Sequence, residues 1–367
     1  MKDDNNKQDE LEYEKVTAKK RKKNKILVRT NRKVGILLDT IKGFLIVIIL
    51  ITLIAFFASA IIHNILRVVE ASNEYSGKYK KLYTAGDGMI NLYTKGTGDR
   101  TLLILPEFGT VSPVIKYKAL ADSLSNAFKV VVVEPLGYGY SLSTKDPRTS
   151  KNIVGELREA LGNAKMEGPY TILAFSSSSI YADYYSKEFP DEVNGIITVN
   201  AVYPEALKNE KFRDSYLPNV VANVKFYSII SFSGIFRWQS FISPGKFDID
   251  KMQANDAYGK EEIKLYRNRL ANKFFTKEMR REISKLQDNM KELSDFKFNE
   301  NLTTLQIITT SYRDECLGRQ ENISKYATDL ITNKEIQKIN TIDGTLEDYL
   351  FTADGIKTLK NLINMYF

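Results

Sequence analysis

Residues 169–179 read Pro-Tyr-Thr-Ile-Leu-Ala-Phe-Ser-Ser-Ser-Ser, and Ile-Tyr-Ala-Asp-Tyr-Tyr follows directly. The run Tyr170–Leu173 is apolar with β-branched residues, and Ile180–Phe189 has helical spacing, so the sequence predicts a tight strand-to-helix turn at Ser176. A nucleophilic serine in a G-x-S-x-G elbow lies on such a turn, and small outer residues let the strand and the helix approach closely. Here the frame is Ala174-Phe175-Ser176-Ser177-Ser178, small at both outer positions although neither is glycine. Ser176 is therefore the candidate nucleophile.

Composition limits what the chain can be. Its 367 residues, 43% hydrophobic and 27% charged, suffice for one large domain or two medium ones. One cysteine, Cys316, excludes an internal disulfide and a multi-cysteine metal site, and we expect no cofactor and no metal. The net charge is +8, but residues 19–42 hold ten lysine and arginine residues against one acidic residue, Asp39. The rest of the chain is near neutral, which argues against nucleic-acid binding by the globular part.

The run Gly43–Ile62 contains twenty residues without a charge. This length crosses a hydrocarbon core of about 30 Å at 1.5 Å per residue, so we predict one transmembrane helix. The basic cluster before it places the N-terminus in the cytoplasm and the chain after residue 63 outside. Ala58-Ser59-Ala60 has the small-x-small pattern of a cleavage site, but the basic leader is long and the apolar run continues past it, which favours an uncleaved anchor. Residues 1–18, polar and of mixed charge, are expected to be disordered.

His63 is the only histidine of the chain and stands at the end of this apolar run. We expect it to be an interfacial residue at a helix end. To act in catalysis it would have to fold back across the stalk that follows.

Strands and helices alternate from residue 79 onward. Continuous apolar strands joined by helical segments predict a mainly parallel sheet covered on both faces by helices. Ligands of such sheets bind at the carboxyl ends of the strands, so the loops after Leu105, Glu134, Phe175 and Val199 should form one pocket. The predicted strands before the elbow are Tyr79–Tyr83 and Met89–Tyr93 as a hairpin, then Thr101–Leu105 and Lys129–Glu134; the helices are Val114–Phe128 and Thr149–Asn163, and Val193–Val199 is the strand after the elbow.

Four segments carry a resemblance to a known family. They are Thr101–Thr110 (TLLILPEFGT), Val130–Ser141 (VVVVEPLGYGYS), Gly168–Ser177 (GPYTILAFSS) and Tyr185–Val193 (YSKEFPDEV). The turn G-Y-G-x-S and the stretch Y-x-x-x-x-P-x-x-V are specific in combination. On these motifs the chain resembles the α/β-hydrolase superfamily, in particular its membrane-anchored bacterial branch.

The resemblance implies an organisation for the whole chain. It covers residue 79 to the end and is interrupted by an insertion that resembles the helical cap of the family. After the cap it implies strands at Thr303–Thr310 and Ile336–Ile342 and a closing helix at Ala353–Tyr366. The resulting domains are a basic cytoplasmic tail (1–42), a transmembrane helix (43–62), a stalk (63–78), an α/β-hydrolase core (79–204 and 299–367) and a helical cap (205–298).

Family chemistry needs a serine nucleophile, a histidine base, an acid that orients the histidine and two backbone N–H donors for the oxyanion. The resemblance implies that Ser176 is the nucleophile and that the N–H groups of Ser177 and Phe108 are the donors. Glu107 stands where relatives have a glycine. Its carboxylate either points inward, where it would oppose the developing negative charge, or points to solvent.

The base is where this sequence departs from the family. The turn Ile342–Asp348 should carry the histidine, but Thr345 or Leu346 stands in its place. Glu347 and Asp348 in the same turn are candidate carboxylate bases if burial raises their pKa. Asp314 is the best positional match for the acid that orients the histidine; the alternative is that Asp314 is a solvated loop residue. Asn200 stands where many relatives have an aspartate.

The aromatic segment Val224–Ile242 within the cap contains the only tryptophan, Trp238. It is a lid over an acyl pocket, an element on the membrane surface, or a helix packed on the domain. The mixed charges of Lys260–Lys297 predict one or two solvated amphipathic helices. Two functions remain. One is a weakly active or non-catalytic ligand-binding or regulatory protein with an apolar or acyl ligand, and the other is an active hydrolase of ester or acyl substrates.

Overall fold

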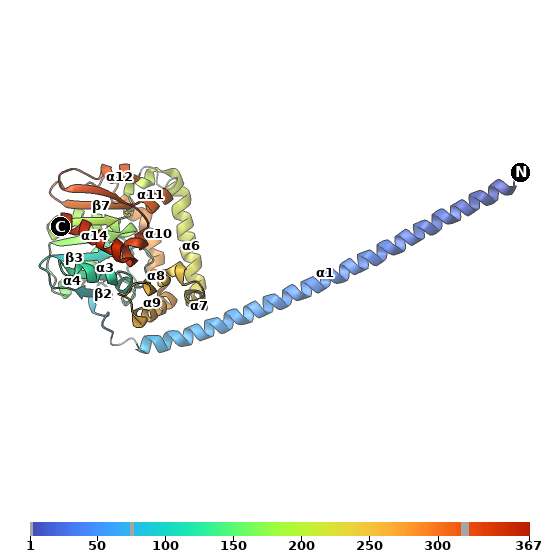
Figure 1. The fold of residues 1–367 in the computed structure, drawn as a ribbon, viewed down its shortest axis with the longest axis horizontal. Helices are drawn as coiled ribbons and strands as arrows, with labels where there is room; N and C mark the ends of the chain where they lie inside the picture. Colours follow the sequence, from blue (N-terminus) through green and yellow to red (C-terminus); the bar gives the residue numbers. More distant parts are fainter. Residues whose placement is uncertain (1–2, 74–76, 317–322) are drawn as a thin grey trace. The chain divides into compact units, whose positions relative to one another are not determined.

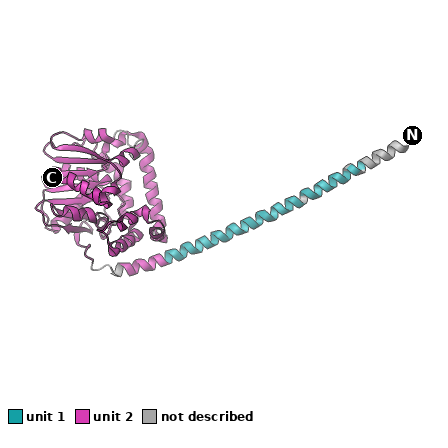
Figure 2. Cartoon of the chain, in the orientation of Figure 1, with its two compact units in different colours: residues 1–61 teal, residues 62–367 magenta. Residues whose placement is uncertain are grey.

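The computed structural model describes residues 3–73, 77–316 and 323–367. These residues form two compact units, 1–61 and 62–367 (Figure 2). The second unit contains the whole sheet and all helices that cover it, so it holds the candidate site.

Helix α1 (Asp3–Asn73) supplies the first unit and the beginning of the second. In the described part of the chain it is the one helix with a stretch, Thr17–Glu70, that is long and apolar enough to cross a membrane. The predicted disorder of residues 1–18 is wrong from Asp3 onward, because lysine, glutamate, leucine and alanine favour a helix; residues 1 and 2 lie outside the described residues. The helix also continues to Asn73, eleven residues into the segment predicted as a stalk.

The eight strands form one sheet with the order β1-β2-β4-β3-β5-β6-β7-β8. Figure 1 labels β2, β3 and β7 of this sheet. Strands β1 and β2 are antiparallel to their neighbours, and β3 to β8 run parallel. The mainly parallel sheet is thus confirmed. Most predicted strand boundaries hold to within a residue or two, and the hairpin shifts by up to three residues. The strands are β1 (Leu82–Ala85), β2 (Gly88–Lys95), β3 (Thr101–Leu105), β4 (Lys129–Glu134), β5 (Tyr170–Phe175), β6 (Val193–Val199), β7 (Thr303–Thr309) and β8 (Gln337–Ile342).

Helices cover both faces of this sheet. Alternate residues of β3 enter different cores: Leu103 packs with helices α4 (Ser150–Asn163) and α5 (Ser179–Glu188), and Leu102 packs with α3 (Lys118–Leu124) and α14 (Ala353–Tyr366). This alternation is the period of two expected for a sheet buried on both sides. The doubly covered sheet predicted from the sequence is therefore confirmed.

One predicted helix is divided. Residues 114–128 were expected to be continuous, but α2 (Pro113–Lys116) ends before Tyr117 and α3 begins after it. The ring of Tyr117 stacks on Phe175 with a centroid distance of 4.7 Å, so burial of this ring against β5 accompanies the break.

Helices fill the segment between β6 and β7. The two long helices α6 and α10 pack against each other, and α7 packs against α9. At the C-terminal end, short helices join β7 to β8 and β8 to α14. The bounds are α6 (Leu217–Ile230), α7 (Ile235–Ile242), α8 (Ile249–Gln253), α9 (Lys260–Lys273), α10 (Lys277–Lys291), α11 (Thr310–Cys316), α12 (Ile323–Asp329) and α13 (Leu346–Phe351), with short helical turns η1 (Ser176–Ser178), η2 (Pro190–Glu192), η3 (Pro204–Lys208), η4 (Phe212–Tyr216), η5 (Ser231–Ser233) and η6 (Pro244–Phe247).

Candidate functional site

Ser176 lies on the turn between β5 and α5, as the sequence predicts. Its φ is +52°, in the left-handed region that a residue with a Cβ seldom adopts. Ser178 holds the turn, because its Oγ accepts the N–H of Phe175 at 3.0 Å and lies 3.0 Å from the carbonyl oxygen of Leu105. A strained serine fixed by its neighbours is the local geometry of a nucleophile elbow.

The hydroxyl of Ser176 has no hydrogen-bond partner among the residues that the structure describes. A serine nucleophile becomes reactive when a base within about 3 Å takes its proton. In the part of the chain that the structure describes, the turn is therefore present without a base hydrogen-bonded to Ser176.

The candidate oxyanion donors are the backbone N–H groups of Ser177 and Phe108. Ser177 lies at the start of η1, where a backbone N–H has no acceptor within the helix. The N–H of Phe108 donates no hydrogen bond within the described residues, whereas the N–H of Glu107 donates to Tyr117 Oη at 3.1 Å. Phe108 N–H is thus available to a ligand oxygen.

The sequence left open whether the Glu107 carboxylate points inward or to solvent. In the structure this carboxylate pairs with Lys116 Nζ. Lys116 is only 7% exposed, and Asp248 Oδ2 from the segment before α8 lies 3.8 Å from the same nitrogen. Burial lowers the pKa of Lys116, but the charges around it, that of Glu107 first, together outweigh burial, and the pKa lies well above its ordinary value. Burial raises the pKa of Asp248, and Lys116 partly offsets this. Lys116 is hence a fixed cation that neutralises Glu107, and it is not a base.

The three candidate carboxylates lie in different surroundings. Asp348 caps α13, because its Oδ2 accepts hydrogen bonds from the N–H and the hydroxyl of Thr345, both at 2.8 Å. The backbone N–H of Thr345 lowers the pKa of Asp348. Glu347 is half-buried in α13, and Asp314 has a side chain 61% exposed with a partner in Arg313. The structure does not join any of them to Ser176 by a hydrogen bond.

Asn200 ends β6 with a φ of +55° and has a structural partner. Its amide donates to Thr309 Oγ1 at 3.1 Å and its Oδ1 accepts the N–H of Thr309 at 2.9 Å. These bonds fasten the end of β6 to the end of β7, so the amide at the acid position has a structural role.

His63 is buried within the second unit, in the part of α1 that follows the apolar run. It packs against Gly234, where an added Cβ would lie 2.6 Å from His63 Cβ, and its Nδ1 accepts a hydrogen bond from Arg237 Nε at 3.4 Å. The imidazole is thus committed to the helix pair α1 and α7.

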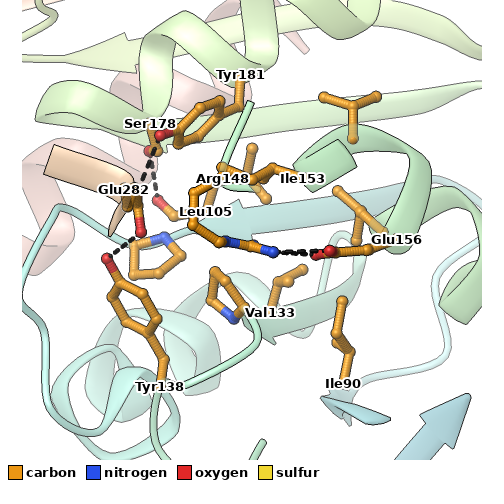
Figure 3. A pocket seen from close by; sticks show the side chains of 14 residues that line it. Ile90, Leu105, Val133, Tyr138, Arg148, Ile153, Glu156, Ser178, Tyr181 and Glu282 are labelled. Carbon is orange, nitrogen blue, oxygen red and sulfur yellow. Dashed lines mark hydrogen bonds and ion pairs between the residues drawn. The ribbon is translucent and has the colours of Figure 1, made fainter. Parts of the chain in front are cut away.

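A small cavity lies between the ends of β3 and β4 and helices α4, α5 and α10 (Figure 3). Two hydrogen-bonded sets of polar side chains line it. Arg148 donates to both carboxylate oxygens of Glu156 at 2.7 and 2.8 Å, and Glu282 of α10 accepts from Tyr138 at 2.8 Å and from Tyr181 at 3.1 Å. Burial raises the pKa of Glu282, although Arg148 opposes this. The cavity volume of about 30 Å³ holds one or two water molecules and is too small for an acyl ligand.

Aromatic side chains connect the loop after β3 with the cap. Phe275, between α9 and α10, stacks on Phe108 with centroids 6.0 Å apart. Tyr227 of α6 stacks on Phe275 with ring centroids 6.3 Å apart. Three stacked rings thus extend from the loop after β3 to α6. Phe275 covers Gly109 as well, because a Cβ there would lie 3.1 Å from its ring.

Several of these residues were not singled out from the sequence. Lys116, Arg148 and Glu282 occupy ordinary helical or loop positions, and their partners are up to about 140 residues away in the chain. One sequence signal could have found Lys116: a charged residue between apolar neighbours, here Ile115 and Tyr117, is seldom buried without a partner of opposite charge.

Comparison with known proteins gives a fold and two partial sequence matches. No family model matches the chain. An uncharacterised protein of Bacillus subtilis (strain 168), YbdG, is 30% identical over 116 residues, which are 32% of this chain and 36% of that protein. An uncharacterised protein of Schizosaccharomyces pombe is 30% identical over 86 residues, 23% of this chain and 16% of that protein. The matches therefore span about a third or less of these relatives.

Solved structures match over a larger part of the chain. An epoxide hydrolase from Vigna radiata superposes with a TM-score of 0.54 and 12% identity, over 78% of this chain and 98% of that one. An α/β hydrolase from a Medee basin deep-sea metagenome gives a TM-score of 0.53 and 17% identity, over 78% and 97%. At these identities the likeness concerns the fold.

Proposed function

The chain has the α/β-hydrolase fold, and we propose that it is a membrane-anchored, extracytoplasmic protein that uses this scaffold to bind a ligand or to regulate a partner, with weak or no catalysis. One observation carries the proposal: Ser176 keeps the strained elbow conformation, but its hydroxyl has no hydrogen-bond partner within the described residues. The fold offers a scaffold for a ligand, and this serine is not joined to a base by a hydrogen bond.

The lack of a base hydrogen-bonded to Ser176 favours a binding or regulatory role over catalysis. A serine hydroxyl is a poor nucleophile near neutral pH, and loss of its base costs roughly a millionfold in turnover. The single histidine, His63, is held by Gly234 and Arg237, and the nearest buried amine in the loop region, Lys116, is protonated. Neither group supports proton abstraction from Ser176.

Membrane anchoring is the second part of the proposal. The apolar run Gly43–Ile62 lies within the helix that is long enough to cross a membrane, and ten basic residues precede it. The positive-inside rule then places residues 1–42 in the cytoplasm and the hydrolase-fold unit outside. No targeting cleavage is needed for this topology.

The ligand class follows from the surroundings of Phe108. The rings of Phe275 and Tyr227 extend the loop toward the cap and favour an apolar or acyl ligand. The cavity beside Ser178 has room only for water, so a ligand that enters there would have to move the cap. Ligand-induced movement of a cap suits a binding or regulatory role.

An active hydrolase of ester or acyl substrates is the second candidate, with Glu347 or Asp348 as an unconventional base and Asp314 as a supporting acid. The positive φ of Ser176 favours it, because strain of this kind persists where function maintains it. The free N–H of Phe108 and the neutralised carboxylate of Glu107 also leave room for an oxyanion.

Turnover separates the two candidates. We expect the purified chain to hydrolyse p-nitrophenyl esters of two to sixteen carbons no faster than the Ser176→Ala variant. A rate that depends on Ser176 and falls in Glu347→Gln or Asp348→Asn would instead support the active hydrolase. Thr345→Ala is the matched control for Asp348→Asn, because it disrupts the same helix cap without removing a carboxylate.

A further inference from the structure

A basic groove lies on the cap between α6 and α10, outside the site described above. Its volume is about 720 Å³, within the range of small-molecule sites. Ten residues line it, and seven of them are lysine or arginine while none is acidic. A groove of this composition suits an anion.

Two of these cations lack an internal counter-charge. Within the described residues, Lys225 of α6 and Arg280 of α10 form no ion pair, and the buried Nε of Arg280 has no hydrogen-bond partner. Arg281 is fixed beside them, because its guanidinium donates to the backbone oxygens of Lys145 and Thr144. Arg281 also pairs with Glu278 at 3.5 Å, whereas Lys225 and Arg280 have no carboxylate partner in the described part of the chain and are the donors that a phosphate group needs.

An apolar face adjoins the groove. Ile229, 61% exposed, lines the groove and also belongs to a run of exposed apolar side chains on α6, η5 and α7. We call this run the apolar face. Its residues are Phe226, Tyr227, Ile229, Phe232, Ile235, Trp238, Phe241 and Ile242. A cationic groove beside such a face is the pattern of an element that lies in a membrane interface.

Helix α7 of this face contacts the residues that follow the predicted span. The predicted span ends at Ile62, and the next residue, His63, packs on Gly234 at the start of α7. Eight residues after Ile62, Glu70 accepts two hydrogen bonds from Arg237 of α7, at 2.6 and 2.9 Å. These contacts lie within the second unit and hold α7 against the first turns of helix that leave the span.

We propose that the cap binds an anionic phospholipid of the membrane that α1 crosses. The phosphate occupies the groove at Lys225 and Arg280, and the acyl chains lie on the apolar face. This proposal rests on the membrane anchor of the proposed function and names its ligand class as anionic lipid. The stack of Tyr227 on Phe275 joins the apolar face to the loop of Phe108.

Quenching of tryptophan fluorescence by brominated lipid provides the test, because the chain has a single tryptophan and a variant can carry it at another position. The full chain is reconstituted in phosphatidylcholine vesicles that contain an equal fraction of brominated phosphatidylcholine or brominated phosphatidylglycerol. Native Trp238 reports contact of the apolar face, and the variant Trp238→Phe with Ile229→Trp reports the groove. We expect both probes to be quenched, and the groove probe to be quenched at least twofold more by the anionic lipid.

Charge variants fix the location. Lys225→Gln with Arg280→Gln should remove the preference for the anionic lipid and keep the quenching of Trp238. Lys291→Gln, on the same helix outside the groove, should change neither. Equal quenching by both lipids in the otherwise unaltered groove probe, or no quenching of Trp238, overturns the proposal.

Two further outcomes are informative. Loss of the lipid preference in 5 mM inorganic phosphate assigns the groove to a soluble anion and overturns the lipid proposal. Flotation with the vesicles after a carbonate wash reports the anchor separately. A chain that floats without lipid preference contradicts only the lipid site, and a chain that does not float contradicts the anchor and the lipid site together.

Discussion

Lys116 neutralises the carboxylate of Glu107 directly beside Phe108, the candidate second oxyanion donor. This pair places a carboxylate where relatives have glycine and yet keeps net negative charge away from the loop. The partner on the other side of Lys116 is Asp248 from the cap. The cap is therefore coupled to the loop through one buried ammonium group.

Removal of that ammonium should be costly. Lys116→Met leaves Glu107 without its counter-charge and Asp248 with Lys251 alone, and we expect the free energy of unfolding to fall by about 2 to 4 kcal/mol. The combined Lys116→Met and Glu107→Gln variant should recover part of this loss. Urea unfolding of the two single variants and the double variant measures the coupling, and additive losses would contradict a direct pair.

The strained backbone of Ser176 predicts a substitution that increases stability. Ser176→Gly should raise the free energy of unfolding by about 1 kcal/mol over Ser176→Ala, because glycine adopts a φ of +52° without the steric cost that a Cβ brings. Thermal unfolding of the two variants is a direct comparison, since both lack the hydroxyl. Equal stability would show that the turn is relaxed.

Asp183 of α5 provides a pH-dependent test. Burial raises the pKa of this carboxyl well above its ordinary value, the carboxylate of Glu205 adds to this, and Oδ1 has no hydrogen-bond partner. The unfolded chain therefore loses the proton first, and the free energy of unfolding falls as the pH rises from about 4 toward the higher folded-state pKa. Asp183→Asn should remove this fall, so that the variant gains over the native chain between pH 5 and 8.

Unfolding curves across this pH range measure the effect of Asp183. About 1.4 kcal/mol is expected for each pH unit between the two pKa values. The exposed Asp295→Asn serves as the control for loss of a charge. Parallel pH profiles of the native chain and Asp183→Asn would refute the assignment.

Local patterns explain why much of the fold was predictable. The predicted strands at 101–105, 129–134 and 193–199 matched the observed strands to the residue, because a buried parallel strand is mostly apolar along its length. The turn at Ser176 was predictable for the same local reason. Short-range sequence determines both.

The rest of the site depends on contacts that local sequence does not encode. Lys116 is separated from Asp248 by 132 positions, and Tyr138 from Glu282 by 144. In the part of α1 that extends to Asn73, Glu70 likewise pairs with Arg237, which lies 167 positions away in the chain. Side-chain pairs of this kind need tertiary structure before they can be assigned.

Gly139 tests the loop after β4. A Cβ on this residue, which has a φ of +43°, would overlap the Glu134 carboxylate that accepts N–H bonds from Tyr140 and Val114 at 2.6 and 3.2 Å. We expect Gly139→Ala to lower the free energy of unfolding by about 3 kcal/mol or more. Gly155→Ala is the control, because no atom lies within 4 Å of its added Cβ and alanine favours helix α4 by up to about 1 kcal/mol. Similar stabilities of the two variants by thermal unfolding would contradict the close packing at Glu134.

The reactivity of Ser176 tests the central claim most directly. Intact mass is measured after the purified full chain has reacted with a fluorophosphonate, with Ser176→Ala beside it. An elbow without a base predicts that the native chain gains no more label than Ser176→Ala while both remain folded. Stoichiometric labelling of the native chain alone would contradict this claim and establish Ser176 as an activated nucleophile.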